Sequence, residues 1–304
     1  MTTIEANTFN RLPQSIAIAA GKGGVGKTTI TATLACIAAS RAIPTVAIDL
    51  DPQANLATVL GVPKEGDFDH GRSFVGAAQG FIAPTLISTG RPNLSMIAGG
   101  EELNSIANLV SRDSDIFDIS QHLCAKIAEV VDPRAWIFID SGPASGSALT
   151  DIALTLAQHL VITAEQGATN VDGVETLVRR CNIHSYEGHQ LISPVGIVRF
   201  RMAERDTAIN ATADAAFEQR VQGVIPMFNT SIRYAKKAAF EAEEYGIVAT
   251  EYAHLADSHN IPYYEYLKRG EKPVSFASNA QDLSNDYRQL ADEITERITN
   301  GPTQ

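Results

Sequence analysis

Cysteine is scarce in this sequence: the 304 residues contain only Cys36, Cys124 and Cys181. These three are far apart and odd in number, so they predict neither a disulfide framework nor a set of metal ligands. A CxxC pair, which could help to hold an iron–sulfur cluster, is also missing, and this argues against an electron-transfer protein. The seven histidines show no ligand spacing either. We expect each cysteine to be a small residue in a packed interior.

Long apolar runs are absent as well. No window approaches the roughly 20 uninterrupted apolar residues that a membrane-spanning helix needs. The first residues, MTTIEANTFNRLPQS, lack the basic and then apolar arrangement of a signal peptide. Both absences predict a cytoplasmic protein.

Basic residues are fewer than acidic ones, 24 against 35, and the formal net charge is −11. This balance argues against a surface that binds nucleic acid over its whole extent. The stretch from Arg199 to Lys237 differs, with seven basic and four acidic residues. The sequence therefore allows a local basic face, and its candidate residues are Arg199, Arg201, Arg205, Arg233, Lys236 and Lys237.

What the sequence does have is an alternation of short Val- and Ile-rich runs with longer amphipathic stretches, which predicts βαβ units around a parallel sheet. We expect strands at Ser15–Ala20, Thr45–Asp49, Trp136–Asp140, Leu160–Ala164 and Val195–Phe200. We expect helices at Lys27–Arg41, Asn170–Cys181, Thr207–Arg220, Ile232–Glu244 and Gln281–Thr299. The predicted fold is a doubly wound, mostly parallel α/β sheet flanked by helices. It comprises a flexible arm at 1–14 and one domain at 15–300, with surface excursions near 62–93 and 254–274.

A glycine-rich turn follows the first predicted strand and opens a helix. Gly21, Gly26, Lys27 and Thr28 meet the pattern G-x-x-x-x-G-K-[ST] of a phosphate-binding loop. In such a loop the backbone N–H groups surround a phosphate, and the helix N-terminus adds positive potential. Lys27 would reach the β- and γ-phosphates, and the Thr28 hydroxyl would bind Mg²⁺. The candidate nucleotide-binding residues are Gly23, Gly24, Val25, Gly26, Lys27, Thr28 and Thr29.

The segment KGGVGKTT resembles the deviant Walker A motif of the ParA/MinD family of P-loop ATPases. In that family the additional lysine crosses the dimer interface and contacts the nucleotide of the partner. The resemblance implies this role for Lys22, which would make ATP part of a homodimer interface. Lys22 is therefore a candidate catalytic residue, as are Lys27 and, from the segment after the second strand described next, Asp51.

The run after the second strand, Asp49-Leu50-Asp51-Pro52-Gln53, resembles the DxDPQ segment of the same family. Both carboxylates lie at the carboxyl end of a strand, where α/β sheets bind ligands. The resemblance implies that Asp51 orients the attacking water and that Asp49 lies in the outer shell of the metal. Asp51, Pro52 and Gln53 would then form a switch that responds to the γ-phosphate.

A third apolar strand ends in Asp140-Ser141-Gly142-Pro143, which resembles the Walker B segment. Asp140 would bind Mg²⁺ through a water, and Asp140, Gly142 and Pro143 would complete the switch. The family commonly has two prolines after this Asp, and Gly142 replaces the first.

The resemblance extends over roughly residues 15–250 and the last helix. Asn93–Ala98 resembles the family's strand before Walker B. Val224-Ile225-Pro226 resembles the turn beside the adenine, so Pro226 joins the nucleotide-binding candidates. Arg233 corresponds to an arginine of the segment that follows this turn.

Within the family, a small ParA protein similar to Soj fits these residues best. The last helix is flanked mostly by acids, which disfavours the membrane-binding helix of MinD-like proteins. Only 14 residues precede the first strand, too few for the helix-turn-helix of larger ParA proteins. The resemblance implies a slow ATPase with ATP and Mg²⁺ as cofactors. It would dimerise on ATP, bind DNA without sequence preference, associate with the nucleoid and be stimulated by a ParB-like centromere-binding partner.

Two other functions remain open from the residues alone. A ParA-like ATPase that distributes a protein compartment over the nucleoid would have the same chemistry, so the sequence does not separate it from a plasmid or chromosome segregation protein. A MinD-like ATPase that cycles on the membrane is the second alternative. A metabolic or electron-transfer enzyme would need substrate or cluster ligands that the sequence lacks.

Overall fold

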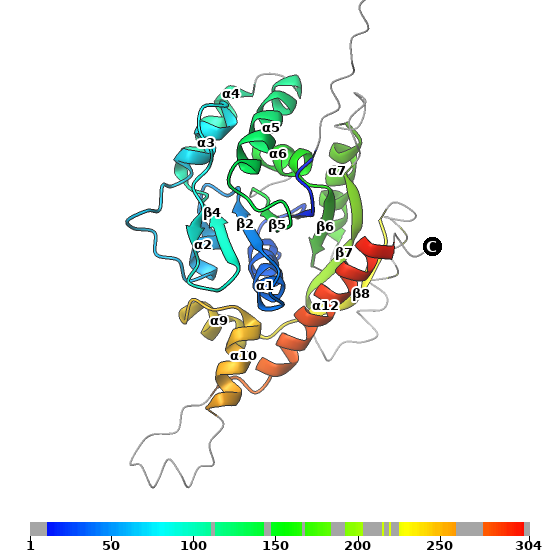
Figure 1. The fold of residues 1–304 in the computed structure, drawn as a ribbon. Helices are drawn as coiled ribbons and strands as arrows, with labels where there is room; N and C mark the ends of the chain where they lie inside the picture. The colour runs from blue at the N-terminus through cyan, green and yellow to red at the C-terminus, as the bar shows by residue number, and fades with distance from the viewer. Residues whose placement is uncertain are drawn as a thin grey trace, which may run out of the picture.

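The structure, a computed structural model, describes residues 11–110, 113–142, 147–165, 168–183, 192–202, 215, 219, 225–259 and 276–300. Within these ranges eight strands form one sheet in the order β3-β4-β2-β5-β1-β6-β7-β8 (Figure 1). All neighbours pair in parallel except β3 and β4. The strands are β1 (Ser15–Ala19), β2 (Thr45–Asp49), β3 (Ile87–Ser88), β4 (Leu94–Ile97), β5 (Trp136–Asp140), β6 (His159–Ala164), β7 (Ser193–Met202) and β8 (Met227–Arg233).

The central strands are buried on both faces, which explains their continuous apolar sequences. In β1, Ile16 and Ile18 pack into one core cluster, while Ala17 and Ala19 pack into the other. A strand between two such layers needs apolar side chains at every position, not at alternate ones. The sheet is therefore doubly wound, as the sequence predicts.

Helices cover the two faces in separate sets (Figure 1). The first face is covered by α1 (Lys27–Ser40), α2 (Asn55–Val59), α9 (Lys236–Glu244), α10 (Ala249–Ser258) and α12 (Ala280–Asn300). The second is covered by α3 (Arg72–Ala78), α4 (Asn104–Leu109), α5 (Asp113–Ala128), α6 (Ala148–Leu156) and α7 (Ala168–Ile183). A short 3₁₀ helix, η1 (Glu101–Leu103), precedes α4.

All five predicted strands are present, and their predicted bounds differ from the observed bounds by at most two residues at either end. The helix predicted at Ile232–Glu244 is wrong at its start, because Ile232 and Arg233 end β8 and the helix begins at Lys236. Three consecutive polar residues, Asn229, Thr230 and Ser231, interrupt the apolar pattern of this edge strand, and a strongly helical run follows it. The helix predicted at Thr207–Arg220 lies almost wholly outside the described residues.

The stretch at 62–93 is more than a surface excursion. It contains α3 and β3, and the side chain of Phe74 in α3 is fully buried in the second core cluster. Of the excursion predicted at 254–274, residues 254–258 belong to α10, and the part from 260 onward lies outside the described residues.

The chain before β1 is bound to the domain over residues 11 and 12, which the sequence analysis assigned to a flexible arm. Arg11 and Leu12 are buried, and Arg11 donates to the carbonyl oxygens of Thr155 at 2.9 Å and Ala157 at 2.7 Å, at the end of α6. Residues 1–10 lie outside the described part. Within the described residues, none of the helices has the length and apolar character to span a membrane.

Candidate nucleotide-binding site

The phosphate loop lies between the end of β1 and the start of α1. Gly24 and Gly26 have φ angles of 80° and 82°, a left-handed conformation that glycine adopts without strain. Gly26 is the residue before the first turn of α1, which begins at Lys27. The Thr163 hydroxyl at the end of β6 donates to the Val25 carbonyl oxygen at 2.5 Å and holds the loop against the sheet. The sequence-predicted loop is therefore in the geometry of a strand-to-helix turn.

Two glycines of the loop are enclosed by neighbouring elements. The backbone of Gly21 packs against Gly173 of α7, where a Cβ on Gly173 would lie 2.5 Å from the Gly21 Cα. A Cβ on Gly26 would overlap the ring of Phe200 at the end of β7. These glycines are thus required by packing as well as by the turn.

The two lysines of the motif have different surroundings. Lys27 is 8% exposed, whereas Lys22, Gly23 and Gly24 are exposed at the outer side of the loop. A buried ammonium group at a helix N-terminus suits an anion bound inside the loop. Lys22, by contrast, is accessible to another molecule.

Asp49 and Asp140 lie side by side at the carboxyl ends of adjacent strands. They are register partners in the pairing of β2 with β5, next to the strand that feeds the phosphate loop. Asp49 is fully buried, and its oxygens accept from the backbone N–H groups of Asp51 at 2.9 Å and Leu56 at 3.2 Å. Burial, and next the charge of Asp140, hold the pKa of Asp49 well above its usual range.

Asp140 is 1% exposed, and neither of its carboxylate oxygens has a hydrogen-bond partner among the described residues. Burial raises its pKa to about 7, while the neighbouring Thr28 hydroxyl and Lys27 ammonium favour the charged form and Asp51 opposes it. A buried carboxylate without a partner is costly unless a cation or a donor completes its surroundings.

These residues fit a magnesium ion bound together with a nucleotide. The Thr28 hydroxyl and the Asp49 and Asp140 carboxylates are oxygen groups of the kind that Mg²⁺ prefers, and within the described part of the chain the Asp140 oxygens have no hydrogen-bond partner. The described residues contain no group of three or more His, Cys, Asp and Glu side chains that could hold a metal. An ion bound together with a nucleotide needs only one or two carboxylates plus phosphate oxygens.

Asp51 lies at the start of the loop between β2 and α2. Its side chain is 8% exposed and accepts from the Gln53 N–H at 2.9 Å, and its carbonyl oxygen accepts from Ala54 and Gly100. A Cβ on Gly99 would lie 2.7 Å from that carbonyl oxygen, so the strand end at Gly99 packs closely on Asp51. Pro52 and Gln53 are partly exposed or exposed at the outer side of this turn.

The second half of the predicted switch is only partly described. Gly142 packs tightly, because a Cβ there would lie 3.1 Å from the Leu50 carbonyl oxygen and 3.2 Å from the Leu149 Cβ. This crowding gives a physical reason for glycine where the family commonly has proline. Pro143 lies outside the described residues.

The structure places Pro226 before β8, three strands from β1, and its predicted contact with the adenine stays a prediction. Pro226 precedes β8, and the next residue, Met227, is level with Ala19 of β1 through the pairings of β6 and β7. Three strand spacings separate β8 from β1 in the sheet, about 14 Å. Val224 lies outside the described part.

A cavity of about 330 Å³ adjoins the loop on the side of α1 and α9. Thr29 and Phe200 line it, together with Arg233 at the end of β8 and Tyr234 and Lys236 after it. No local motif marks these last residues as part of a nucleotide site. Arg233 and Lys236 are predicted above as candidates for DNA binding, and they lie near Thr29 only in the folded chain.

Most of the basic candidates are engaged within the protein. Arg201 pairs with Glu165 at 3.1 Å, and Arg233 pairs with Asp286 at 2.8 Å and Asp282 at 3.3 Å. Arg199 donates to the carbonyl oxygens of Phe228 and Asn229, and Lys237 lies 3.6 Å from Glu241. Lys236 and Lys237 are exposed at the start of α9. Arg205 lies outside the described residues.

The family of the chain follows from comparison with known proteins. The family model AAA_31, an AAA domain, matches residues 13–191, a span that contains the phosphate loop and the three aspartates. The chain belongs to this family.

Curated relatives support the expected resemblance to ParA-type proteins. "Putative replication protein A" of Rhizobium rhizogenes is 32% identical over 160 residues, which cover 49% of this chain and 39% of the relative. "Virulence plasmid ParA family protein pGP5-D" of Chlamydia psittaci is 26% identical over 170 residues, which cover 56% of this chain and 63% of the relative. The chain thus spans between about two fifths and just under two thirds of the length of these relatives.

Solved structures show the same fold. An ATP complex of McdA(D38A) from Cyanothece has a TM-score of 0.69 at 19% identity, covering 97% of this chain and 99% of McdA. Cobyrinic acid a,c-diamide synthase from Mycobacterium smegmatis, with an ATP analogue and magnesium, has 0.66 at 20%, covering 95% and 98%. The cell division ATPase MinD of Pyrococcus furiosus has 0.60 at 20%, covering 93% and 98%. The P-loop ATPase fold of the ParA/MinD type is confirmed.

Proposed function

We propose that this chain is a ParA-type ATPase that uses ATP to partition a plasmid or a chromosome. The observation that carries the proposal is the register pairing of Asp49 with Asp140 beside the phosphate loop, with both Asp140 oxygens buried and without a hydrogen-bond partner among the described residues. Two strand-end carboxylates, a buried lysine and a hydroxyl at a helix N-terminus form a site for a magnesium nucleotide. The ParA family relative supports the choice of partition within this ATPase fold.

The positions of the individual residues support the following proposed roles. Lys27, buried at the start of α1, would neutralise charge on the β- and γ-phosphates. Thr28 and Asp140, with Asp49 behind, would hold Mg²⁺, which when bound stabilises negative charge on the phosphates. Asp51 would orient the attacking water, since phosphoryl transfer needs positioning more than covalent chemistry. Lys22 would contact the nucleotide of a second copy, so that ATP completes a sandwich dimer.

We further propose that the ATP-bound dimer binds DNA through phosphate contacts and without sequence preference. Lys236 and Lys237 are the strongest candidates, because both are exposed at the start of α9, whereas Arg233 is paired with Asp282 and Asp286 and Arg199 is bound to carbonyl groups. Slow hydrolysis, stimulation by a ParB-like centromere-binding protein and association with the nucleoid belong to the same proposal.

Co-sedimentation with random-sequence DNA tests this function. We expect retention with ATP but not with ADP or without nucleotide, and a steep loss as salt rises, because each neutralised phosphate adds about −0.9 to the slope of log K against log salt. The double variant Lys236→Ala/Lys237→Ala should lose retention. Arg134→Ala, which removes an exposed charge at the amino end of β5, should keep it. Absence of retention in every nucleotide state would contradict DNA partition.

A further inference from the structure

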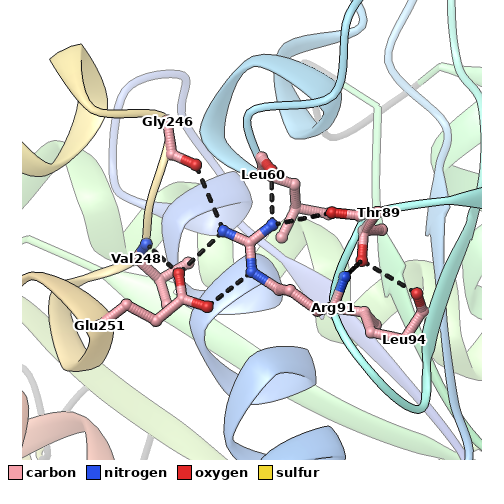
Figure 2. Close-up of polar contacts among 7 residues, drawn as sticks. All are labelled: Leu60, Thr89, Arg91, Leu94, Gly246, Val248 and Glu251. Carbon is pink, nitrogen blue, oxygen red and sulfur yellow. Dashed lines mark hydrogen bonds and ion pairs between the residues drawn. The ribbon is translucent and has the colours of Figure 1, made fainter.

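Arg91, in the loop between β3 and β4, has every donor of its guanidinium engaged. Its side chain is 16% exposed. Nε and Nη2 donate to the two Glu251 oxygens at 2.6 and 2.8 Å, Nη1 donates to Leu60 at 2.6 Å and Thr89 at 3.4 Å, and Nη2 also donates to Gly246 at 3.2 Å (Figure 2). A guanidinium has five N–H groups, so none remains for a ligand. The side chain acts on the segments that it joins.

The partners of Arg91 belong to segments far apart in the sequence. Leu60 follows the last residue of α2, and Gly246 ends the turn after α9. Glu251 lies in the first turn of α10 and also accepts from the Val248 N–H at 3.0 Å. Figure 2 shows these groups converging on one guanidinium from three directions. Arg91 therefore fastens the end of α2 to the α9–α10 turn.

The same two segments touch through their backbones. Gly61 and Gly246 have φ angles of 64° and 63°, and a Cβ on Gly246 would lie 2.8 Å from the Gly61 Cα. No side chain separates the end of α2 from the end of α9. A displacement of one would be passed to the other, because packed backbone is hardly compressible.

The other end of α2 is held by the Asp49 carboxylate and the Asp51 backbone carbonyl group. The Leu56 N–H donates to Asp49 at 3.2 Å, and the Ala54 N–H donates to the Asp51 carbonyl oxygen at 3.0 Å. The helix has only five residues, Asn55–Val59, so its two ends are about 8 Å apart. On the far side of the Arg91 contact, α9 begins with the exposed Lys236 and Lys237.

We propose that Arg91 is a positioning residue that couples the Asp49–Asp51 segment to α9 through α2. The arrangement of the aspartates for ATP hydrolysis and the position of Lys236 and Lys237 are then set together. This inference rests on the proposed ATPase function and adds a link between its two surfaces. Lysine cannot replace Arg91, because its ammonium group has three donors and lacks the planar fork that engages a carboxylate and several carbonyls at once.

The test combines steady-state kinetics with hydrogen exchange on the full chain. In Arg91→Lys we expect KM for ATP within about twofold of wild type and kcat lowered about tenfold, as for a misplaced catalytic group. In wild type, ATP should change amide exchange in the phosphate loop and across residues 236–244. In Arg91→Lys the change in the loop should remain and that in 236–244 should be lost. Arg134→Lys, in an exposed ion pair with Asp132, is the matched control.

Glu251→Gln is the second variant, for use if Arg91→Lys does not fold, and it should show the same separation of loop from α9. Wild-type kcat together with an ATP response at 236–244 in a folded variant would overturn the coupling. So would a wild-type protein in which ATP protects the loop and leaves 236–244 unchanged, although nucleotide binding would stand. A wild-type loop that does not respond to ATP would instead remove the proposed function itself.

Discussion

At the scale of single residues, the phosphate loop depends on glycines, which have no side chain. Gly24 and Gly26 share the same left-handed φ, but their surroundings differ. A Cβ on Gly24 would meet nothing within 4 Å, whereas a Cβ on Gly26 would overlap the Phe200 ring. Alanine at Gly24 would therefore incur only the free-energy cost of the left-handed backbone conformation. Alanine at Gly26 would incur that cost and the cost of a steric clash as well.

Gly24→Ala should lower the free energy of unfolding by about 1 kcal/mol, the cost of placing an L-residue in the left-handed region. Gly26→Ala should cost about 1–3 kcal/mol more, because Phe200 must also be displaced in a packed interior. Urea unfolding without nucleotide measures both variants under the same conditions. Equal losses in the two would show that Phe200 does not confine the loop.

At the scale of elements, α12 is fastened to the edge of the sheet by charged groups. Glu293 accepts from the backbone N–H groups of Asn229 at 2.9 Å and Thr230 at 3.0 Å in β8. Arg297 pairs with Glu293 at 2.7 Å and donates to the Val195 carbonyl oxygen at 3.0 Å. Burial opposes the charge on Glu293, but these donors together lower its pKa below the usual 4.5.

A carboxyl group whose pKa is lower in the folded state stabilises the fold above the unfolded pKa and loses this effect as the pH falls through the folded pKa. Glu293→Gln should therefore lower the free energy of unfolding by about 1 kcal/mol at pH 7. The difference from wild type should shrink below pH 4.5. Denaturant titrations at several pH values measure it. Glu296→Gln, at an exposed position one turn along α12, is the control and should leave the free energy of unfolding at pH 7 close to that of wild type.

The elements that sequence predicts well are those with a strong local signal. β1 and β2 are continuously apolar because both their faces are buried, and α1 follows an unmistakable glycine-rich turn. In contrast, α3 has seven residues, too few to show a helical period, and the polar residues of β8 hide a strand. Short and edge elements owe their conformation to tertiary contacts that no local pattern records.

The candidate site divides in the same way. Motifs predict Lys27, Asp49 and Asp140, because Asp49 and Asp140 end apolar strands and Lys27 follows a glycine-rich turn, and the structure brings the three together. Arg91 carries no such signal. Two of its partners are carbonyl groups at Leu60 and Gly246, which any residue could supply, and they lie 31 and 155 positions away in the chain.

At the scale of the whole molecule, the two lysines of the loop differ in whether they are buried within the chain or exposed on its surface. Lys27 is enclosed by its own chain, whereas Lys22 is exposed on the outer side of the loop. If Lys22 contacts the nucleotide of a second copy, as we propose, the nucleotide lies at an interface between two copies. The site of one chain is then incomplete without the other.

Lys22→Ala should still bind ATP but fail to dimerise, whereas Asp51→Ala should dimerise on ATP and no longer hydrolyse it. Light scattering after size exclusion with ATP measures the masses. Lys126→Ala, which removes a lysine of the α5 surface, should behave as wild type in both assays. An Asp51→Ala protein that binds ATP and stays monomeric would contradict the sandwich dimer.

The contact between Gly21 and Gly173 has a consequence for how this sequence can change over generations. The two backbones meet with no room for a methyl group on either side, so a packing requirement, independent of any phosphate, keeps both positions as glycine. A descendant that abandoned nucleotide chemistry would be released from selection on Lys27 and Asp140 but not on this pair. Gly21, the first residue of the phosphate-loop motif, would then remain glycine after the ATPase activity had been lost.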